Sequence, residues 1–104
     1  MALKIEWSHE ALKNLDDLIL YLENNWDKKV IQRFFRRMET IIETLSLYPS
    51  AYRLVVKKKG IRKAIITKQV SMYYQKKNSG IEIITLLDNR MNPKAIRVAL
   101  KDKK

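Results

Sequence analysis

The sequence predicts an α+β fold in the order β-α-α-β-β-β, in which an antiparallel sheet packs on an antiparallel pair of helices. Two long segments in the first half carry apolar residues at helical spacing. The second half consists of short segments rich in β-branched and aromatic residues, and turn signals separate them. An alternating segment at the start supplies one further strand.

The chain has 104 residues, and we expect residues 1–104 to form one domain with a frayed tail at 101–104. It contains no cysteine, which excludes disulfides, thiolate zinc sites and cysteine nucleophiles and fits a reducing cytoplasm. No apolar stretch approaches the roughly 18 residues that cross a bilayer. These features predict a soluble cytoplasmic protein without a membrane partner.

The first strand and helix are read from residues 2–22. Residues 2–7 (A-L-K-I-E-W) alternate between apolar and charged side chains, which is the period of a half-buried strand. Ser8 is a suitable N-cap, since its hydroxyl can accept a hydrogen bond from the free amides of a first helical turn. Apolar residues then recur at helical spacing between Ala11 and Leu22.

The second helix is predicted to begin after Asp27, a capping residue, and to end at Tyr48-Pro49-Ser50. Its apolar stripe, between Ile31 and Leu45, packs with the first helix as an αα-hairpin against a common core. The outer face of this helix carries three basic residues, Arg33, Arg36 and Arg37.

The remaining strands are predicted at 54–56, 61–67, 70–75 and 81–87. Their short connections make them antiparallel neighbours in a meander, and the isolated first strand is expected to join the same sheet. The strand at 81–87 is the most apolar, so we expect it to be central. A short C-terminal helix is expected over 93–100. With the helix hairpin on one face, the other face is expected to be partly polar and to receive the lysines and arginines of 53–77.

The net charge of +11 is concentrated in the second half of the chain. Residues 1–50 hold seven Lys/Arg and eight Asp/Glu, whereas residues 51–104 hold fifteen Lys/Arg and three Asp/Glu. Such an asymmetry predicts one continuous exposed surface for an acidic partner, which is a nucleic acid, an acidic protein or an anionic membrane.

The candidate residues for contact with a nucleic acid or another target are the basic and aromatic side chains of the meander. Cations grip phosphates, and rings can stack on bases. Tyr73 and Tyr74 point to opposite faces of their strand, so we expect at most one of them in the core. The full set is Tyr52, Arg53, Lys57, Lys58, Lys59, Arg62, Lys63, Lys68, Tyr73, Tyr74, Lys76, Lys77 and Arg90.

Several kinds of catalytic and cofactor site are excluded by composition. A single histidine, His9, and the lack of cysteine provide neither a metal-ligand cluster nor a hydrolase triad. Gly60 and Gly80, the two glycines, are each explained by a turn, so the chain has no phosphate-binding loop. We expect neither a metal nor a cofactor.

The order of elements, together with four stretches of sequence, resembles the RelE/ParE superfamily of toxins from bacterial type II toxin–antitoxin modules. The stretches are IEWSHEALKNLDDLILYLENNW, LSLYPSAYR, GIRKAIITKQVSMYYQ and IEIITLLDNRMNPKAI, so the resemblance covers nearly the full length. It implies a toxin that inhibits growth, a cognate antitoxin that wraps and neutralises it, and a possible hetero-oligomer of the two.

The superfamily has two branches, which the resemblance does not separate. RelE-like members cut messenger RNA on the ribosome, and ParE-like members poison DNA gyrase. For the nuclease branch the resemblance implies phosphate-stabilising roles for Arg62 and Arg90, which Lys63 could share. Two departures are that Ser71 stands where many nucleases have a third arginine, and that the tail after Arg90 has no tyrosine or histidine.

Cleavage of RNA requires a general base and a general acid, and arginine is a poor base. The sequence therefore favours the gyrase-directed branch, which needs no catalytic group, and predicts that the protein is not an enzyme. The alternatives are a ribosome-dependent endoribonuclease and a non-toxic module that binds nucleic acid or protein on the same scaffold. Arg90 is expected either to contact the target or to pair with Asp88.

Overall fold

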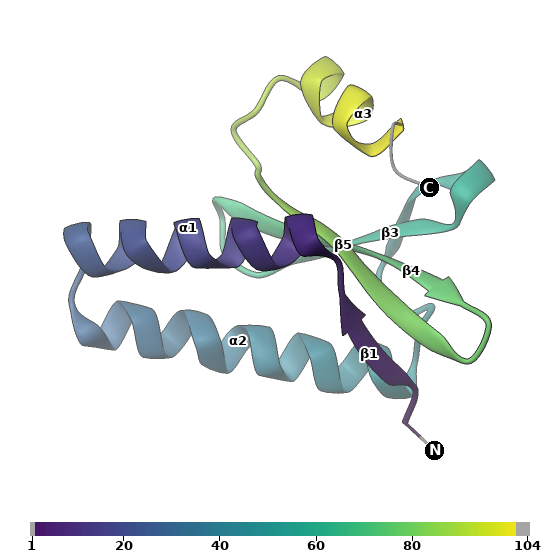
Figure 1. The fold of residues 1–104 in the computed structure, drawn as a ribbon, viewed down its shortest axis with the longest axis horizontal. Helices are drawn as coiled ribbons and strands as arrows, with labels where there is room; N and C mark the ends of the chain where they lie inside the picture. The colour runs from purple at the N-terminus through teal and green to yellow at the C-terminus, as the bar shows by residue number, and fades with distance from the viewer. Residues whose placement is uncertain (1, 102–104) are drawn as a thin grey trace.

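The computed structural model describes residues 2–101 and confirms the predicted α+β fold (Figure 1). The elements follow in the order β1 (Lys4–Trp7), α1 (His9–Asn25), α2 (Lys28–Leu47), β2 (Arg53–Val56), the 3-10 turn η1 (Lys57–Lys59), β3 (Ile61–Ile65), β4 (Val70–Lys77), β5 (Gly80–Asp88) and α3 (Pro93–Lys101). The predicted C-terminal helix is thus present. The frayed tail predicted for 101–104 lies outside the described residues, apart from Lys101 at the end of α3.

The five strands form one sheet in the order β1-β5-β4-β3-β2. Strands β2 to β5 make the predicted antiparallel meander. The first strand joins the same sheet as expected, but it runs parallel to β5, so the sheet is mixed. The β5 strand is interior rather than central, because β4 occupies the middle. Gly80 opens β5 where a Cβ atom would lie 2.9 Å from the Lys4 carbonyl oxygen, so the approach of β1 requires glycine.

Both predicted helix caps are present, and the first also joins a helix to the sheet. Ser8 Oγ accepts the Ala11 N–H at 3.0 Å and donates to the Ile84 carbonyl at 2.6 Å. Asp27 Oδ1 accepts the Val30 N–H at 3.1 Å. The start of α1 is therefore held on β5, because one hydroxyl serves as cap and as cross-link.

The main core lies between the helix pair and one face of the sheet (Figure 1). Its buried residues come from both helices and from β3, β4 and β5, and they include Leu22, Phe34, Met38, Leu45, Met72, Tyr74 and Ile83. The Tyr74 hydroxyl donates to the Pro49 carbonyl at 2.8 Å, which fixes the loop between α2 and β2 beneath the sheet. In the part of the chain that the structure describes, no helix is long and apolar enough to cross a membrane.

A second apolar cluster lies on the opposite face of the sheet, under α3 (Figure 1). Leu100 and Ile96 of α3 pack against Ile61, Tyr73 and Ile84. The expectation that this face would be partly polar and would receive the cations is therefore wrong where α3 covers it. How much of the sheet a nine-residue helix covers depends on where the helix packs, which the local pattern of residues 93–101 does not indicate.

The expectation that at most one of Tyr73 and Tyr74 is buried is also wrong, because each is 1% exposed. The two rings do point to opposite faces of β4, but both faces are covered. Burial raises the pKa of both hydroxyls. Neither ring offers a surface on which a base could stack.

Candidate functional site

The turn after β5 places Arg90 in a bidentate contact with Asp88. Arg90 Nη2 lies 2.7 Å from Asp88 Oδ2, and Arg90 Nε lies 3.0 Å from Asp88 Oδ1. The hydrogen bonds from the Arg90 side chain and backbone lower the pKa of Asp88 to about 2, and Asp88 in turn raises the pKa of Arg90. The expected pairing of the two residues is confirmed. The Arg90 side chain is nevertheless 69% exposed, so its outer face is accessible to a target.

Asn89 fixes this turn to the neighbouring hairpin between β3 and β4. Its backbone N–H donates to the Gln69 carbonyl at 2.7 Å, and its Nδ2 donates to the Lys68 carbonyl at 3.1 Å. Its Oδ1 accepts the Ser71 hydroxyl at 2.6 Å. Ser71 is fully buried, so the position that departs from the nuclease pattern serves here to hold the turn. Sequence reasoning missed Asn89, although a polar residue directly after an apolar strand was a usable signal.

Arg62 is bound by backbone carbonyls on the helix-facing side of the sheet. Its Nη1 donates to the Tyr52 carbonyl at 2.8 Å and lies 3.4 Å from the Ser50 carbonyl. The same loop also accepts the Tyr74 hydroxyl. The guanidinium therefore holds the loop between α2 and β2 in place. Part of its N–H donors already contact carbonyl oxygens of this loop, so fewer of them are available to bind a phosphate.

Lys63 follows Arg62 on β3 and points to the other face of the sheet. It lies opposite Arg53 on one side and Tyr73 on the other, and Tyr73 in turn lies opposite Thr85, five residues before Arg90. Among the three residues expected to stabilise a phosphorane, Arg62 and Lys63 thus lie on opposite faces of β3, and Arg90 lies in the turn beyond the end of β5. The fold does not bring Arg62, Lys63 and Arg90 together.

The other expected target-binding cations gather at the two ends of the sheet. Lys57, Lys58 and Lys59 form η1, at the same end as Lys76 and Lys77 at the end of β4. Lys68 lies at the opposite end, beside the turn that contains Arg90. Lys77 is paired with Glu82 at 2.8 Å, and the Lys59 ammonium donates to the Lys101 carbonyl. The expected single cationic surface is therefore divided.

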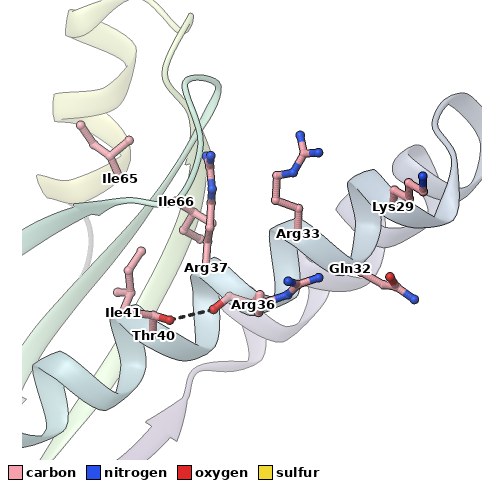
Figure 2. A pocket seen from close by; sticks show the side chains of 9 residues that line it. All are labelled: Lys29, Gln32, Arg33, Arg36, Arg37, Thr40, Ile41, Ile65 and Ile66. Carbon is pink, nitrogen blue, oxygen red and sulfur yellow. Dashed lines mark hydrogen bonds between the residues drawn. The ribbon is translucent and has the colours of Figure 1, made fainter.

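A cationic groove, which we call the α2 groove, lies between α2 and the end of β3 (Figure 2). It has a volume of about 800 Å³. Its lining residues are Lys29, Gln32, Arg33, Arg36, Arg37, Thr40, Ile41, Ile65 and Ile66. Figure 2 shows Arg33 and Arg37 rising from α2 on the side of the β3–β4 hairpin, with Ile65 and Ile66 on the strand above the helix.

The four cations of the α2 groove have no ion-pair partner among residues 2–101. Sequence reasoning placed the three arginines on an outer helix face and did not assign them a role. The signal it overlooked was four cations within nine residues, in a half of the chain whose net charge is close to zero.

A smaller hollow of about 310 Å³ adjoins the α2 groove and shares Arg33 and Arg37 with it. Its other lining residues are mainly apolar and include Leu18, Tyr21, Leu22, Trp26, Val30, Phe34 and Val70. Tyr21 and Trp26 are each about half exposed. The cationic surface thus continues into an apolar one near the connection between the helices.

The described side chains provide exposed cations that can bind anions. His9 is exposed on the first turn of α1 and has no carboxylate or nucleophile bonded to it among the hydrogen bonds of residues 2–101. Within that range, no group of three His, Cys, Asp or Glu side chains is placed to hold a metal ion. The described residues thus provide two cationic features. Arg90 is held by Asp88 at one end of the sheet, and the cations of the α2 groove have no ion-pair partner among residues 2–101.

Comparison with known proteins identifies the family. The model of the ParE toxin of type II toxin–antitoxin systems, parDE, matches residues 5–93. No curated protein sequence matches the chain.

Solved structures with the same fold include three toxins or toxin systems. The chromosomal ParDE TA system from P. aeruginosa has 13% identity and a TM-score of 0.67, over 84% of this chain and 96% of that one. A copper-bound mutant toxin from Helicobacter pylori has 22% identity and a TM-score of 0.60, over 84% and 94%. The E. coli DinJ-YafQ toxin-antitoxin complex has 14% identity and a TM-score of 0.58, over 96% and 98%. Since the family model matches most of the chain and these structures share its fold, the chain belongs to the family of ParE toxins of type II toxin–antitoxin systems.

Proposed function

We propose that the protein arrests growth by poisoning DNA gyrase in the cytoplasm, and that a cognate antitoxin holds it inactive in a hetero-oligomer. The observation that carries the choice of target is the separation of Arg62, Lys63 and Arg90. A ribonuclease would need cations beside one phosphate, together with an acid and a base. A protein that traps another enzyme's reaction needs only an exposed binding surface.

Arg90 is the residue proposed to contact the target. It is exposed, its position is fixed through Asp88, and the turn that carries it is held on the β3–β4 hairpin by Asn89. A cation held in this way loses little side-chain entropy on binding an acidic group of the target. The antitoxin is supported by the relatives of the same fold, which include a ParDE system and a DinJ-YafQ toxin-antitoxin complex.

The test is induced expression in a bacterial host, with pulses of labelled thymidine and labelled amino acid taken as growth slows. We expect DNA synthesis to stop before protein synthesis. If protein synthesis stops first and cleaved transcripts accumulate, the protein is a RelE-like ribonuclease. If growth continues with soluble, folded protein in the cells, it is a non-toxic binding module. Either of these results overturns the proposal.

Two arginine variants then test the assigned residue. Arg90→Ala should abolish growth arrest, whereas Arg97→Ala, which removes an exposed arginine from α3, should leave it unchanged. Circular dichroism of both purified variants checks that they are folded. If a folded Arg90→Ala variant still arrests growth, then Arg90 does not contact the target. Whether the protein is a gyrase-directed toxin is then decided by the labelling experiment alone.

A further inference from the structure

One end of the sheet, which we call the lysine end, gathers seven lysines from four elements. Lys4 of β1 and Lys77 of β4 both lie opposite Gly80, on either side of β5. Figure 1 shows η1 and the turn between β4 and β5 projecting on the same side of the molecule, away from the connection between the two long helices. The lysine end comprises Lys4, Lys57, Lys58, Lys59, Lys76, Lys77 and Lys101.

Side-chain hydrogen bonds hold η1 and the end of α3 beside the strands. Gln75 Nε2 donates to the Lys59 carbonyl, so the turn that carries three of the lysines is fixed on β4. The Lys59 ammonium donates to the Lys101 carbonyl, so the C-terminal end of α3 lies at η1. The fold therefore brings lysines together that are far apart in the sequence.

The charge of the lysine end is only partly balanced by carboxylates. Glu82 lies 2.8 Å from Lys77, and Glu6 lies 3.9 Å from Lys4. Three further lysines are exposed and form no ion pair with any residue in 2–101, namely Lys57, Lys58 and Lys76. A lysine ammonium is a compact charge on a flexible stem, so these three can reach anionic groups that lie at different positions.

The side chains of this surface fit the outside of a nucleic-acid duplex better than they fit a polypeptide or a single strand. A polypeptide partner is usually held by apolar and aromatic side chains at the centre of the interface, and a single strand by rings on which its bases stack. The large exposed apolar side chains of residues 2–101 lie elsewhere, on or next to the three helices, in β2 and at the end of β3. A duplex presents phosphates on its outside and requires neither kind of contact.

The width of the lysine end also suits a duplex. From β1 across β5 and β4 to β3 there are three spacings between neighbouring strands, which together measure about 14 Å. Duplex DNA carries one phosphate per roughly 1.7 Å of its axis, so this width faces about eight phosphates. Each unpaired lysine can therefore reach a phosphate of its own.

We infer that the lysine end binds the phosphate backbone of duplex DNA, independently of base sequence, and that Lys57, Lys58 and Lys76 each neutralise a phosphate. The further statement that this duplex is the DNA held by gyrase rests on the proposed function. Arg90 lies at the opposite end of the sheet, so one molecule can contact the enzyme and its DNA at once. Two such linked contacts bind more tightly than either of them alone.

The test uses purified full-length protein and a short fluorescein-labelled DNA duplex, with fluorescence anisotropy measured from about 50 to about 200 mM salt. We expect saturable binding, with equal affinity for two duplexes of unrelated sequence. The logarithm of the binding constant should fall linearly with the logarithm of the salt concentration, because bound lysines release counterions. Absence of saturable binding at the lowest salt concentration, or a strong preference for one sequence, overturns the inference.

The triple variant Lys57→Gln, Lys58→Gln, Lys76→Gln identifies the surface. Each lost phosphate contact should reduce the steepness of the salt dependence by about 0.9, so the triple variant should lose about 2.7. These side chains are exposed, so the variant should fold, which circular dichroism checks. A folded triple variant with an unchanged salt dependence shows that these lysines do not contact the duplex, and the inference is then wrong.

Two control variants separate a defined surface from net charge. The variant Lys13→Gln, Lys28→Gln, Lys94→Gln makes the same change in net charge on exposed helix residues outside the lysine end, and its salt dependence should change by less than about 1. Equal losses in the two lysine variants would mean that only net charge matters, which overturns the inference. The variant Arg33→Gln, Arg36→Gln, Arg37→Gln tests the α2 groove, and a larger loss there than at the lysine end would place the duplex in that groove instead.

Unlabelled competitors test the class of partner. At equal concentration of charge, single-stranded RNA and poly-L-glutamate should displace the labelled duplex less readily than unlabelled duplex does. If the RNA is the better competitor, the lysine end is a site for single strands, and if poly-L-glutamate is better, it is a site for an acidic polypeptide. Either result overturns the inference.

These measurements contain neither gyrase nor a host cell. A protein that arrests DNA synthesis but does not bind the duplex would overturn this inference and leave the proposed function standing. A protein that binds the duplex as described but does not arrest growth would overturn the proposed function alone.

Discussion

Replacement of Arg62 by methionine should destabilise the fold rather than remove a catalytic group. The change keeps most of the aliphatic length but deletes the donor that lies 2.8 Å from the Tyr52 carbonyl. A hydrogen bond from a charged donor contributes about 1.5–3 kcal/mol. The second contact, at 3.4 Å to the Ser50 carbonyl, adds little at that length. We therefore expect a loss of about 2 kcal/mol in the free energy of unfolding, which corresponds to a fall in Tm of roughly 10 °C for a domain of this size.

The measurement is urea unfolding followed by tryptophan fluorescence and circular dichroism, with Lys63→Met as the matched control. Lys63 is the next residue on the strand, and its side chain makes no hydrogen bond or ion pair with a residue in 2–101, so the change leaves the pairing of its backbone with the neighbouring strands intact. Its replacement should change stability by less than about 0.5 kcal/mol. If Arg62→Met is as stable as the wild type and yet has lost toxicity, then Arg62 acts on the target and the structural role assigned to it is wrong.

Two further predictions concern the buried tyrosines and the Asp88–Arg90 pair. Tyr74→Phe should lower the free energy of unfolding by about 1–2 kcal/mol, because the Pro49 carbonyl loses its donor. Tyr73→Phe should have a clearly smaller effect in the same urea titration. Equal effects of the two changes would contradict the role of the Tyr74 hydroxyl in holding the loop. In an NMR titration of the folded protein, the Asp88 carboxyl should titrate near pH 2 rather than near its ordinary value of 3.8. Because this pKa is lowered on folding, the stability it contributes is fully present above the unfolded pKa of about 4 and is lost as the pH falls through about 2. A midpoint near 3.8 would show that the contact with Arg90 does not persist in solution.

Most of the fold could be predicted because local signals agreed with one another. The capping residues Ser8 and Asp27 fixed where the helices begin, and the apolar stripes fixed the faces that they bury. Turn residues separated the strands of the meander. The parallel pairing of β1 with β5 was not predicted, since the partner of a strand isolated by two helices is decided by packing. The close approach of Lys4 to Gly80 is visible only in three dimensions.

The candidate site was less predictable, because it depends on which surfaces remain exposed. Alternation correctly placed Tyr73 and Tyr74 on opposite faces, but it did not indicate that α3 covers the second face. Arg62 was counted as available for a target because sequence does not reveal that a loop offers it carbonyl oxygens. The net charge of each half of the chain also did not indicate the α2 groove, because the cations of the groove belong to the half whose net charge is near zero.

The central claim, that this member of the ParE toxin family acts on gyrase, is tested most directly with purified components. Relaxed plasmid, ATP and gyrase are incubated with increasing amounts of the protein, and heat-unfolded protein and the Arg90→Ala variant serve as controls. The account predicts that the folded wild-type protein inhibits supercoiling and that both controls inhibit much less. Full supercoiling in the presence of excess folded protein, together with transcript cleavage by the same preparation in a translating extract, would contradict it.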